Sequence, residues 1–256
     1  MTLVENLMIN YIVISPTLAL LLTVIILLFC TITISTPMYI KKWVSFSGVL
    51  LTLFMIFLKF GLYSTDGISA YFSNMILSDP FSLVGNTLIA FILLFTFSSF
   101  WKTSELIESK TTEALILIFM SASGFMLMVD SENFIMLFIG LEIGSISLYA
   151  LAGLNRGDQL SNEASLKYFL LGSLASCIFI YGIALLYVSL SIIGLYEINI
   201  AINYIGLNNV PLTSFIGIIF IIVGLLFKVA AAPFQAWAPD AVSYTHLRAH
   251  ETMAHR

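Results

Sequence analysis

Long apolar runs alternate with short polar connections along this chain, and these runs determine the expected fold. A helix needs about 20 predominantly apolar residues to cross a hydrocarbon core of about 30 Å. Continuous runs of this kind favour helices over barrel strands, which are shorter and alternate. The predicted fold class is all-α: a polytopic transmembrane helix bundle of about seven helices, the seventh broken near Pro233. The expected spans are Tyr11–Ile34, Trp43–Tyr63, Phe81–Phe100, Ala114–Val129, Phe134–Gly153, Leu166–Leu190 and Leu212–Ala232.

The charges of the connecting segments alternate in sign and predict an orientation. The first, third and fifth connections carry the basic residues Lys41, Lys42, Lys102, Lys110 and Arg156. The second, fourth and sixth carry the acidic residues Asp66, Asp79, Asp130, Glu132 and Glu197, without Lys or Arg. Because basic connections stay on the inner side of a membrane, we expect the N-terminus to face away from the cytoplasm or matrix. We expect Lys59, near the end of the second span, to reach the interface by snorkelling.

Composition agrees with a membrane protein and removes other classes. Hydrophobic residues make up 60% of the chain and charged residues 9%, with a mean hydropathy of +1.04. Soluble domains carry about 25% charged residues. The net charge of -4 is scattered and indicates no nucleic-acid partner. Cys30 and Cys177 fall inside predicted spans, where we expect apolar packing and neither a disulfide framework nor a metal site.

Three charged side chains, Glu142, Lys167 and Lys228, fall within or near predicted spans and need an explanation. Each charge at the centre of a membrane helix costs about 2.5–3.5 kcal/mol on insertion scales. Such a group must be paired, hydrated or shifted toward neutrality. Intramembrane carboxylates often mark ion routes. For Glu142, the alternative is a buried side chain that only joins helices by hydrogen bonds.

The surroundings of Glu142 divide its helix into two sides. Ser145 and Tyr149, three and seven residues later, share the face of Glu142. Gly140 and Gly144 lie on the opposite side and predict close packing against another helix. This arrangement favours a protonatable Glu142 on an ion path.

Lys167 and Lys228 stand in different local patterns. Glu163 lies four residues before Lys167, which is the favourable order for a helical ion pair and leaves a simple interfacial pair open. Lys228 lies deep in the seventh span, five residues before Pro233. A proline breaks or kinks a helix, and a break at membrane depth must be satisfied by protein or water. Since burial disfavours the charged form of an amine, we expect Lys228 to exchange a proton, with a plain packing role as the alternative.

Three runs, "GLEIGSISLYALAG", "EASLKYFLLGSLAS" and "GLLFKVAAAPFQAWAPD", together with "DPFS" at 79–82, resemble the antiporter-like membrane-arm subunits of respiratory complex I, NADH:quinone oxidoreductase. Within that family the pattern is most similar to subunit 2, called N in bacteria, over most of residues 75–240. The resemblance implies that Glu142, Lys167 and Lys228 relay protons along a hydrated row of charges. It also implies a non-redox subunit that has no cofactor and does not bind NADH directly. The implied partners are the other membrane-arm subunits and the lipid bilayer. The implied location is an energy-transducing membrane, either the mitochondrial inner membrane or a bacterial plasma membrane.

The chain also departs from the family pattern. Gln235 stands where the family usually has a histidine, and the family continues after Asp240 with many more helices. We expect N-terminal helices over 1–113, an incomplete antiporter-like repeat over 114–240, and a non-native tail over 241–256. His246 and His250 in that tail are four residues apart but lack the glutamate of a zinc-protease motif, so we expect no metal.

Two other functions stay open at this point. A subunit of a monovalent cation/proton antiporter would share the same core motifs. An inert truncated fragment, or a structural spacer, would need none of the three charges to exchange protons.

Overall fold

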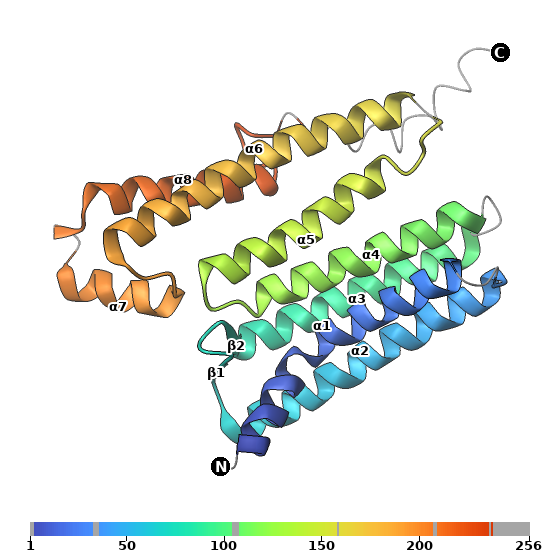
Figure 1. The fold of residues 1–256 in the computed structure, drawn as a ribbon, viewed down its shortest axis with the longest axis horizontal. Coiled ribbons are helices and arrows are strands. Elements are labelled where there is room, and N and C mark those ends of the chain that lie inside the picture. The colour runs from blue at the N-terminus through green and yellow to red at the C-terminus, as the bar shows by residue number, and fades with distance from the viewer. Residues whose placement is uncertain are drawn as a thin grey trace. The chain divides into compact units, whose positions relative to one another are not determined.

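The computed structural model describes residues 3–32, 36–103, 108–157, 159–206, 209–235 and 237. The long apolar helices are α1 (Leu3–Ile32), α2 (Met38–Asp66), α3 (Pro80–Thr103), α4 (Glu108–Val129), α5 (Phe134–Ala152) and α6 (Gln159–Leu190), and the shorter apolar helix α8 (Leu212–Lys228) follows them. Between them lie the strands β1 (Ser69–Tyr71) and β2 (Ile76–Ser78) and the short helix α7 (Leu195–Ile205). Contacts divide the chain into two compact units, residues 1–147 and residues 148–256. Figure 1 shows the helices and strands of both units.

The predicted all-α bundle is confirmed. Six helices in the described part of the chain are long and apolar enough to cross a membrane, and α8 is a shorter apolar helix of 17 residues. A helix satisfies its own backbone hydrogen bonds, which is why it suits a solvent without water. Large apolar side chains remain exposed on the outer faces, as at Phe95 and Val188, so these faces suit contact with lipid.

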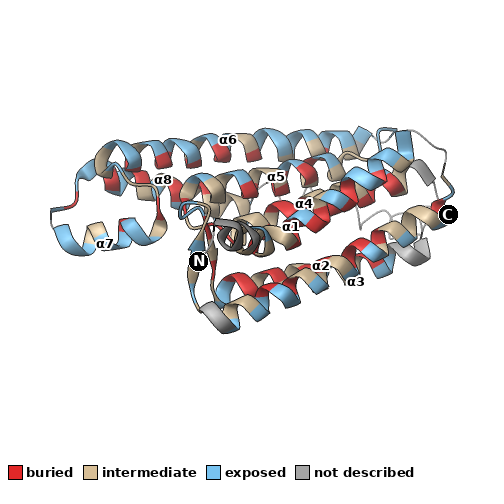
Figure 2. Cartoon of the chain, turned by 60° about the horizontal axis from the view of Figure 1, so that its bottom comes forward, coloured by how far each residue is buried: buried red, intermediate tan, exposed pale blue. Residues whose placement is uncertain are grey.

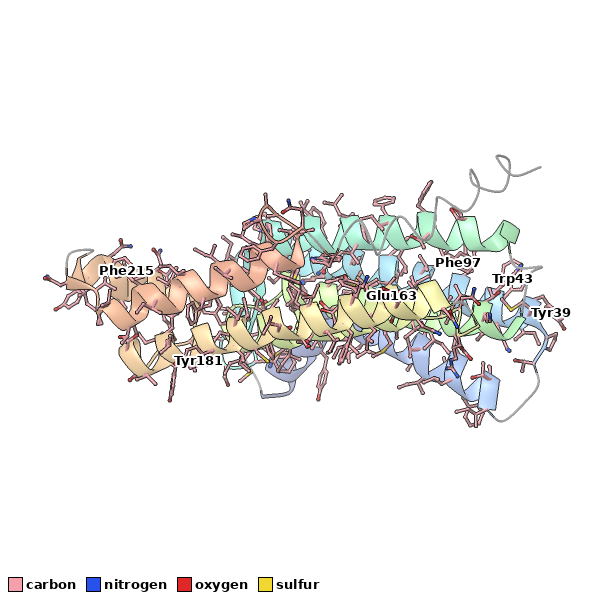
Figure 3. All side chains as sticks on the ribbon, turned by 90° about the horizontal axis from the view of Figure 1, so that it is seen from above. Tyr39, Trp43, Phe97, Glu163, Tyr181 and Phe215 are labelled. Carbon is pink, nitrogen blue, oxygen red and sulfur yellow. The ribbon has the colours of Figure 1, made fainter. Side chains whose placement is uncertain are left out.

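The first unit is built around the side-by-side helices α1 to α4. Figure 2 shows that these helices turn buried residues toward one another and exposed residues outward. An aromatic contact adds to the packing: Phe46 lies between Trp43 and Phe97, both labelled in Figure 3, at ring-centre distances of 5.9 Å and 6.2 Å. The core residues are Leu20, Val24, Met38, Val49, Ile56, Ala90, Leu93, Phe97, Leu115, Phe119, Ala122 and Met126.

A two-stranded hairpin joins α2 to α3 and lies at the ends of the helices. Ser69 pairs with Ser78 and Tyr71 with Ile76 in antiparallel register. The hairpin also bonds to the connection after α4: the Leu77 amide donates to the Asp130 carbonyl (2.8 Å), and the Glu132 amide donates to the Met75 carbonyl (2.9 Å). These bonds attach the hairpin to the end of α4.

The second unit consists of the end of α5, α6, α7 and α8. Helices α6 and α8 pack closely because glycines meet: a Cβ added to Gly182 would lie 2.7 Å from the carbonyl oxygen of Gly217. Sequence reasoning did not predict α7, because its 11 residues are too few to produce a long apolar run. α8 ends at Lys228, five residues before Pro233, which agrees with the predicted break.

Candidate functional site

Glu142 lies on α5, half-buried, in the first unit. The opposite side of the helix packs against α4 as predicted: a Cβ added to Gly140 would lie 2.5 Å from the amide nitrogen of Met128. Gly144 packs equally closely on the ring of Phe125, where an added Cβ would come within 2.7 Å. This close contact fixes the orientation of α5 against α4. The side that carries Glu142 also carries the buried Ser145 and Tyr149.

Lys228 is the last residue of α8 and is half-buried in the second unit. Its Nζ donates a hydrogen bond to the Tyr149 hydroxyl at 2.9 Å and lies 5.5 Å from the centre of that ring. A phenol hydroxyl can accept from an ammonium group and donate to a neutral amine. The contact can therefore persist in both protonation states of Lys228.

Aromatic rings and a small residue hold Tyr149 in place. The Tyr168 ring meets the Tyr149 ring edge-on at 4.5 Å and stacks on Trp237 at 4.4 Å. Gly172 leaves room for the Tyr149 hydroxyl, because a Cβ at that position would overlap it. The phenol is thus positioned from two turns of α6.

The broken end of α8 is satisfied by protein groups. The Phe227 carbonyl accepts from the Ala230 amide at 3.1 Å and from Trp237 Nε1 at 3.1 Å. The Ala231 amide donates to the Leu226 carbonyl at 2.9 Å. Carbonyls at the end of a helix lack intrahelical partners. These hydrogen bonds provide partners for the carbonyl groups at the end of α8, next to Lys228.

Lys167 forms an ion pair with Glu163 on α6, with Nζ 2.8 Å from Oε1. Glu163 is labelled in Figure 3. The two side chains are 45% and 55% exposed, respectively, so the pair has the geometry of the simple interfacial alternative. Lys167 and Lys228 belong to the second unit and Glu142 to the first.

The snorkelling predicted for Lys59 is wrong. Its side chain is fully buried, and Nζ lies 2.7 Å from Oδ1 of Asp130, which is 1% exposed. Asn86 Nδ2, from α3, donates to the same oxygen at 2.8 Å. Burial raises the pKa of Asp130 from 3.8 to about 6, against the opposing effects of Lys59 and Asn86. The sequence did contain a signal for this contact. α2 and α4 both precede acidic connections, so the ends of the two helices are expected on the same side of the membrane.

The other residues considered from sequence carry less chemistry. Cys30 is half-buried on α1 and Cys177 exposed on α6. Among the residues with described placement, no three His, Cys, Asp or Glu side chains gather as a metal site. The predicted tail at 241–256, with His246 and His250, lies outside the described residues.

The fold and the site define a multi-pass membrane helix bundle that carries a buried ion pair and ends one helix at a lysine. The family model described as "NADH:quinone oxidoreductase/Mrp antiporter, TM" matches residues 131–246. Residues 131–246 of the chain belong to this family, and the chain is a multi-pass protein of an energy-transducing membrane.

Individual relatives agree with this assignment. NADH-quinone oxidoreductase subunit N 1 of Chloroherpeton thalassium is 44% identical over 170 residues, 66% of this chain and 35% of that protein. Subunit N of Flavobacterium psychrophilum is 36% identical over 181 residues, 71% of this chain and 39% of that protein. The chain thus spans little more than a third of the length of these relatives.

Solved structures show the same fold. A chain in the structure of respiratory complex I from Thermus thermophilus with bound aureothin matches with a TM-score of 0.69 and 28% identity, over 88% of this chain and 46% of that chain. A chain of the archaeal membrane-bound sulfane sulfur reductase matches with a TM-score of 0.73 at 22% identity, over 91% of this chain and 47% of that one, which supports the fold alone.

Proposed function

We propose that this protein is a non-redox, proton-translocating membrane subunit of NADH:quinone oxidoreductase, in which Glu142, Lys167 and Lys228 relay protons. The hydrogen bond between Lys228 Nζ and the Tyr149 hydroxyl carries the proposal. It joins a titratable amine at a helix break to a proton-carrying group on α5, seven residues after Glu142. Amines and phenols in such contact can pass a proton between them.

The relay would work by changing which charges face one another. Lys167 pairs with Glu163 in the second unit, and this half-exposed pair could open under the influence of neighbouring subunits. Its opening would change the charges along the relay and so move a proton onward. Each charge moved across the membrane works against about 2.3 kcal/mol per 100 mV, and the redox chemistry elsewhere in the complex would supply that energy.

The same proposal defines the partners. Other membrane-arm subunits would bind this chain within the bilayer, and NADH and quinone would react elsewhere. The apolar exposed faces of the helices are compatible with both lipid and neighbouring subunits.

Glu142→Gln in the intact complex tests the proposal. Proton pumping is measured as the fluorescence quenching of a membrane-permeant dye that responds to acidification of the vesicles. The quenching is divided by the rate of NADH oxidation in the same vesicles. We expect the variant to assemble and to pump less per NADH oxidised. Glu197→Gln is the matched control, since Glu197 lies exposed in the first turn of α7. Normal pumping by an assembled Glu142→Gln complex would contradict the assignment.

A monovalent cation/proton antiporter subunit is the second candidate, because the matching family model covers Mrp antiporters as well. Proton movement driven by a Na⁺ gradient in the native membrane, without NADH oxidation, would favour this function over the first.

A further inference from the structure

The buried trio of Lys59, Asp130 and Asn86 has no part in the relay proposed above. It lies where α2, α3 and the end of α4 meet inside the first unit, and its members are 0%, 1% and 0% exposed. Removing two charges from water is expensive, and their attraction offsets this only when the remaining polar atoms are also satisfied. The number of hydrogen bonds that the trio makes therefore shows whether its polar atoms are satisfied by protein groups.

The trio is short of hydrogen-bond partners. Asp130 Oδ1 accepts two bonds, from Lys59 and Asn86, while Asp130 Oδ2 and Asn86 Oδ1 accept none. Lys59 donates one bond of the three that an ammonium group can make. Among the described residues, four buried side-chain polar atoms lack a partner, and two of them belong to this trio.

A third such atom lies close along the chain. It is the hydroxyl of Ser78, next to Leu77, whose amide bonds to the Asp130 carbonyl. Native proteins satisfy nearly all buried polar groups, and a buried water typically makes about three hydrogen bonds to groups that are otherwise unpaired. The unpaired donors of Lys59 and the unpaired oxygens of Asp130 and Asn86 provide such partners.

We propose that Lys59, Asp130 and Asn86 bind water and form an additional proton-exchange site in the N-terminal helices. This inference rests on the proposed proton-translocating function. In the exchange step, an N–H bond of the Lys59 ammonium breaks and the bound water takes that proton. The water passes one of its own protons to Asp130 Oδ2, which leaves a neutral amine, a neutral carboxyl group and an unchanged water. The reverse step restores the ion pair.

Burial raises the pKa of Asp130 to about 6, so a protonated carboxyl group at this position is less unfavourable than it would be in water. Besides Lys59, the charged group that acts on Asp130 is Asp79, in the turn between β2 and α3, which also favours a protonated Asp130. A metal cation would be repelled, since the Lys59 ammonium already neutralises the carboxylate.

The position of the site suits exchange with the aqueous side. The hairpin of β1 and β2 covers it through the bonds of Leu77 and Glu132 and the bridge between Ile76 and Ser131 (Figure 1). Local opening of a short two-stranded hairpin requires little free energy.

Density for water in the unmodified complex is the first test. A cryo-electron microscopy map that resolves waters should contain a peak within hydrogen-bond distance of Asp130 Oδ2 and Asn86 Oδ1. A dry site, closed by apolar side chains, would overturn the inference without any variant being made.

Neutral variants supply the functional test. The double variant Lys59→Met/Asp130→Asn removes both charges together and should assemble, because neither charge is left unpaired. We expect a loss of proton pumping per NADH oxidised. An assembled double variant that pumps like the unmodified complex would show a structural ion pair only, and would overturn the inference. If the double variant does not assemble, the water density decides.

Glu142→Gln, measured in parallel, separates the two proposals. Reduced pumping in Glu142→Gln with normal pumping in the assembled double variant removes the additional site and leaves the proposed function intact. Normal pumping in both removes the proposed function as well.

Discussion

Lys59 and Asp130 in the first unit, and Lys167 and Glu163 in the second, form ion pairs of nearly equal length, 2.7 Å and 2.8 Å. Their surroundings differ. The first pair joins α2 to the end of α4 across 71 residues of sequence and is shielded from solvent, whereas the second joins adjacent turns of α6 and is half-exposed. A distance between charges therefore says little about the energy of a pair, because desolvation and screening decide it.

The difference in burial also suggests different roles for the two ion pairs. A buried pair must stay matched for the bundle to hold together, so its removal acts first on folding. An exposed pair can open at little cost, which is what a switch needs. We therefore expect variants of the first pair to lose stability and variants of the second to lose activity while the protein remains folded.

Lys59→Met should have the largest effect on stability. It leaves the Asp130 carboxylate buried without its ammonium partner, and breaking one side of a buried pair costs about 3–5 kcal/mol. Unfolding by denaturant in detergent micelles measures the change. Lys59→Met/Asp130→Asn should recover most of the loss. If the single variant is as stable as the unmodified protein, the pair is not buried in the folded chain.

The pH dependence of stability should show the raised pKa of Asp130. The folded state holds a proton on this carboxyl up to about pH 6, while the unfolded state releases it near pH 3.8. The contribution of Asp130 to stability is therefore greatest in acid and falls as pH rises from about 4 to about 6, by on the order of 2–3 kcal/mol. The Asp130→Asn variant, compared at each pH, should lack this contribution. The opposite slope for the difference would mean that attraction to Lys59 outweighs burial.

Sequence alone could predict the spans because a sufficiently long apolar run in a lipid bilayer forms a membrane-spanning helix. Phe134–Gly153 was expected and α5 covers Phe134–Ala152. The start of α6 was missed by seven residues, because Gln159 to Ser165 form about two mostly polar turns of helix without a continuous apolar run. α7 was missed because its 11 residues are too few to form a long apolar run.

The candidate site was only partly predictable, since partners in space are distant in sequence. Glu163 and Lys167 are four residues apart, and their pairing could be read directly. Tyr149 and Lys228 are 79 residues apart, and Lys59 and Asp130 are 71 apart, so neither contact has a local pattern. Charge at a helix end predicts snorkelling for Lys59, and only the packing of three helices reverses it.

Tyr149→Phe should have an intermediate effect that tests the second unit. It removes the hydroxyl bonded to Lys228 and keeps the ring against Tyr168, so the loss should be about 1–2 kcal/mol. Pumping per NADH oxidised should fall as well, if the phenol carries protons. Gly172→Ala should shift the same hydroxyl, whereas Gly61→Ala, with no atom within 4 Å of the added methyl, serves as the control. Unchanged pumping in a folded Tyr149→Phe variant would assign this tyrosine to packing alone.

Lys167→Met should have the smallest effect on stability, about 0–1 kcal/mol, because an exposed ion pair is screened by water and ions. Its effect on pumping should nevertheless be large, since Lys167 is proposed to be part of the proton relay. Arg156→Met, an exposed charge of the same sign in the connection before α6, controls for loss of charge. The stability assay and the vesicle assay, run on the same preparations, compare the two quantities. A Lys167→Met variant that loses as much stability as Lys59→Met would show that neighbouring subunits bury this ion pair too. The difference between the two ion pairs would then hold only for the isolated chain.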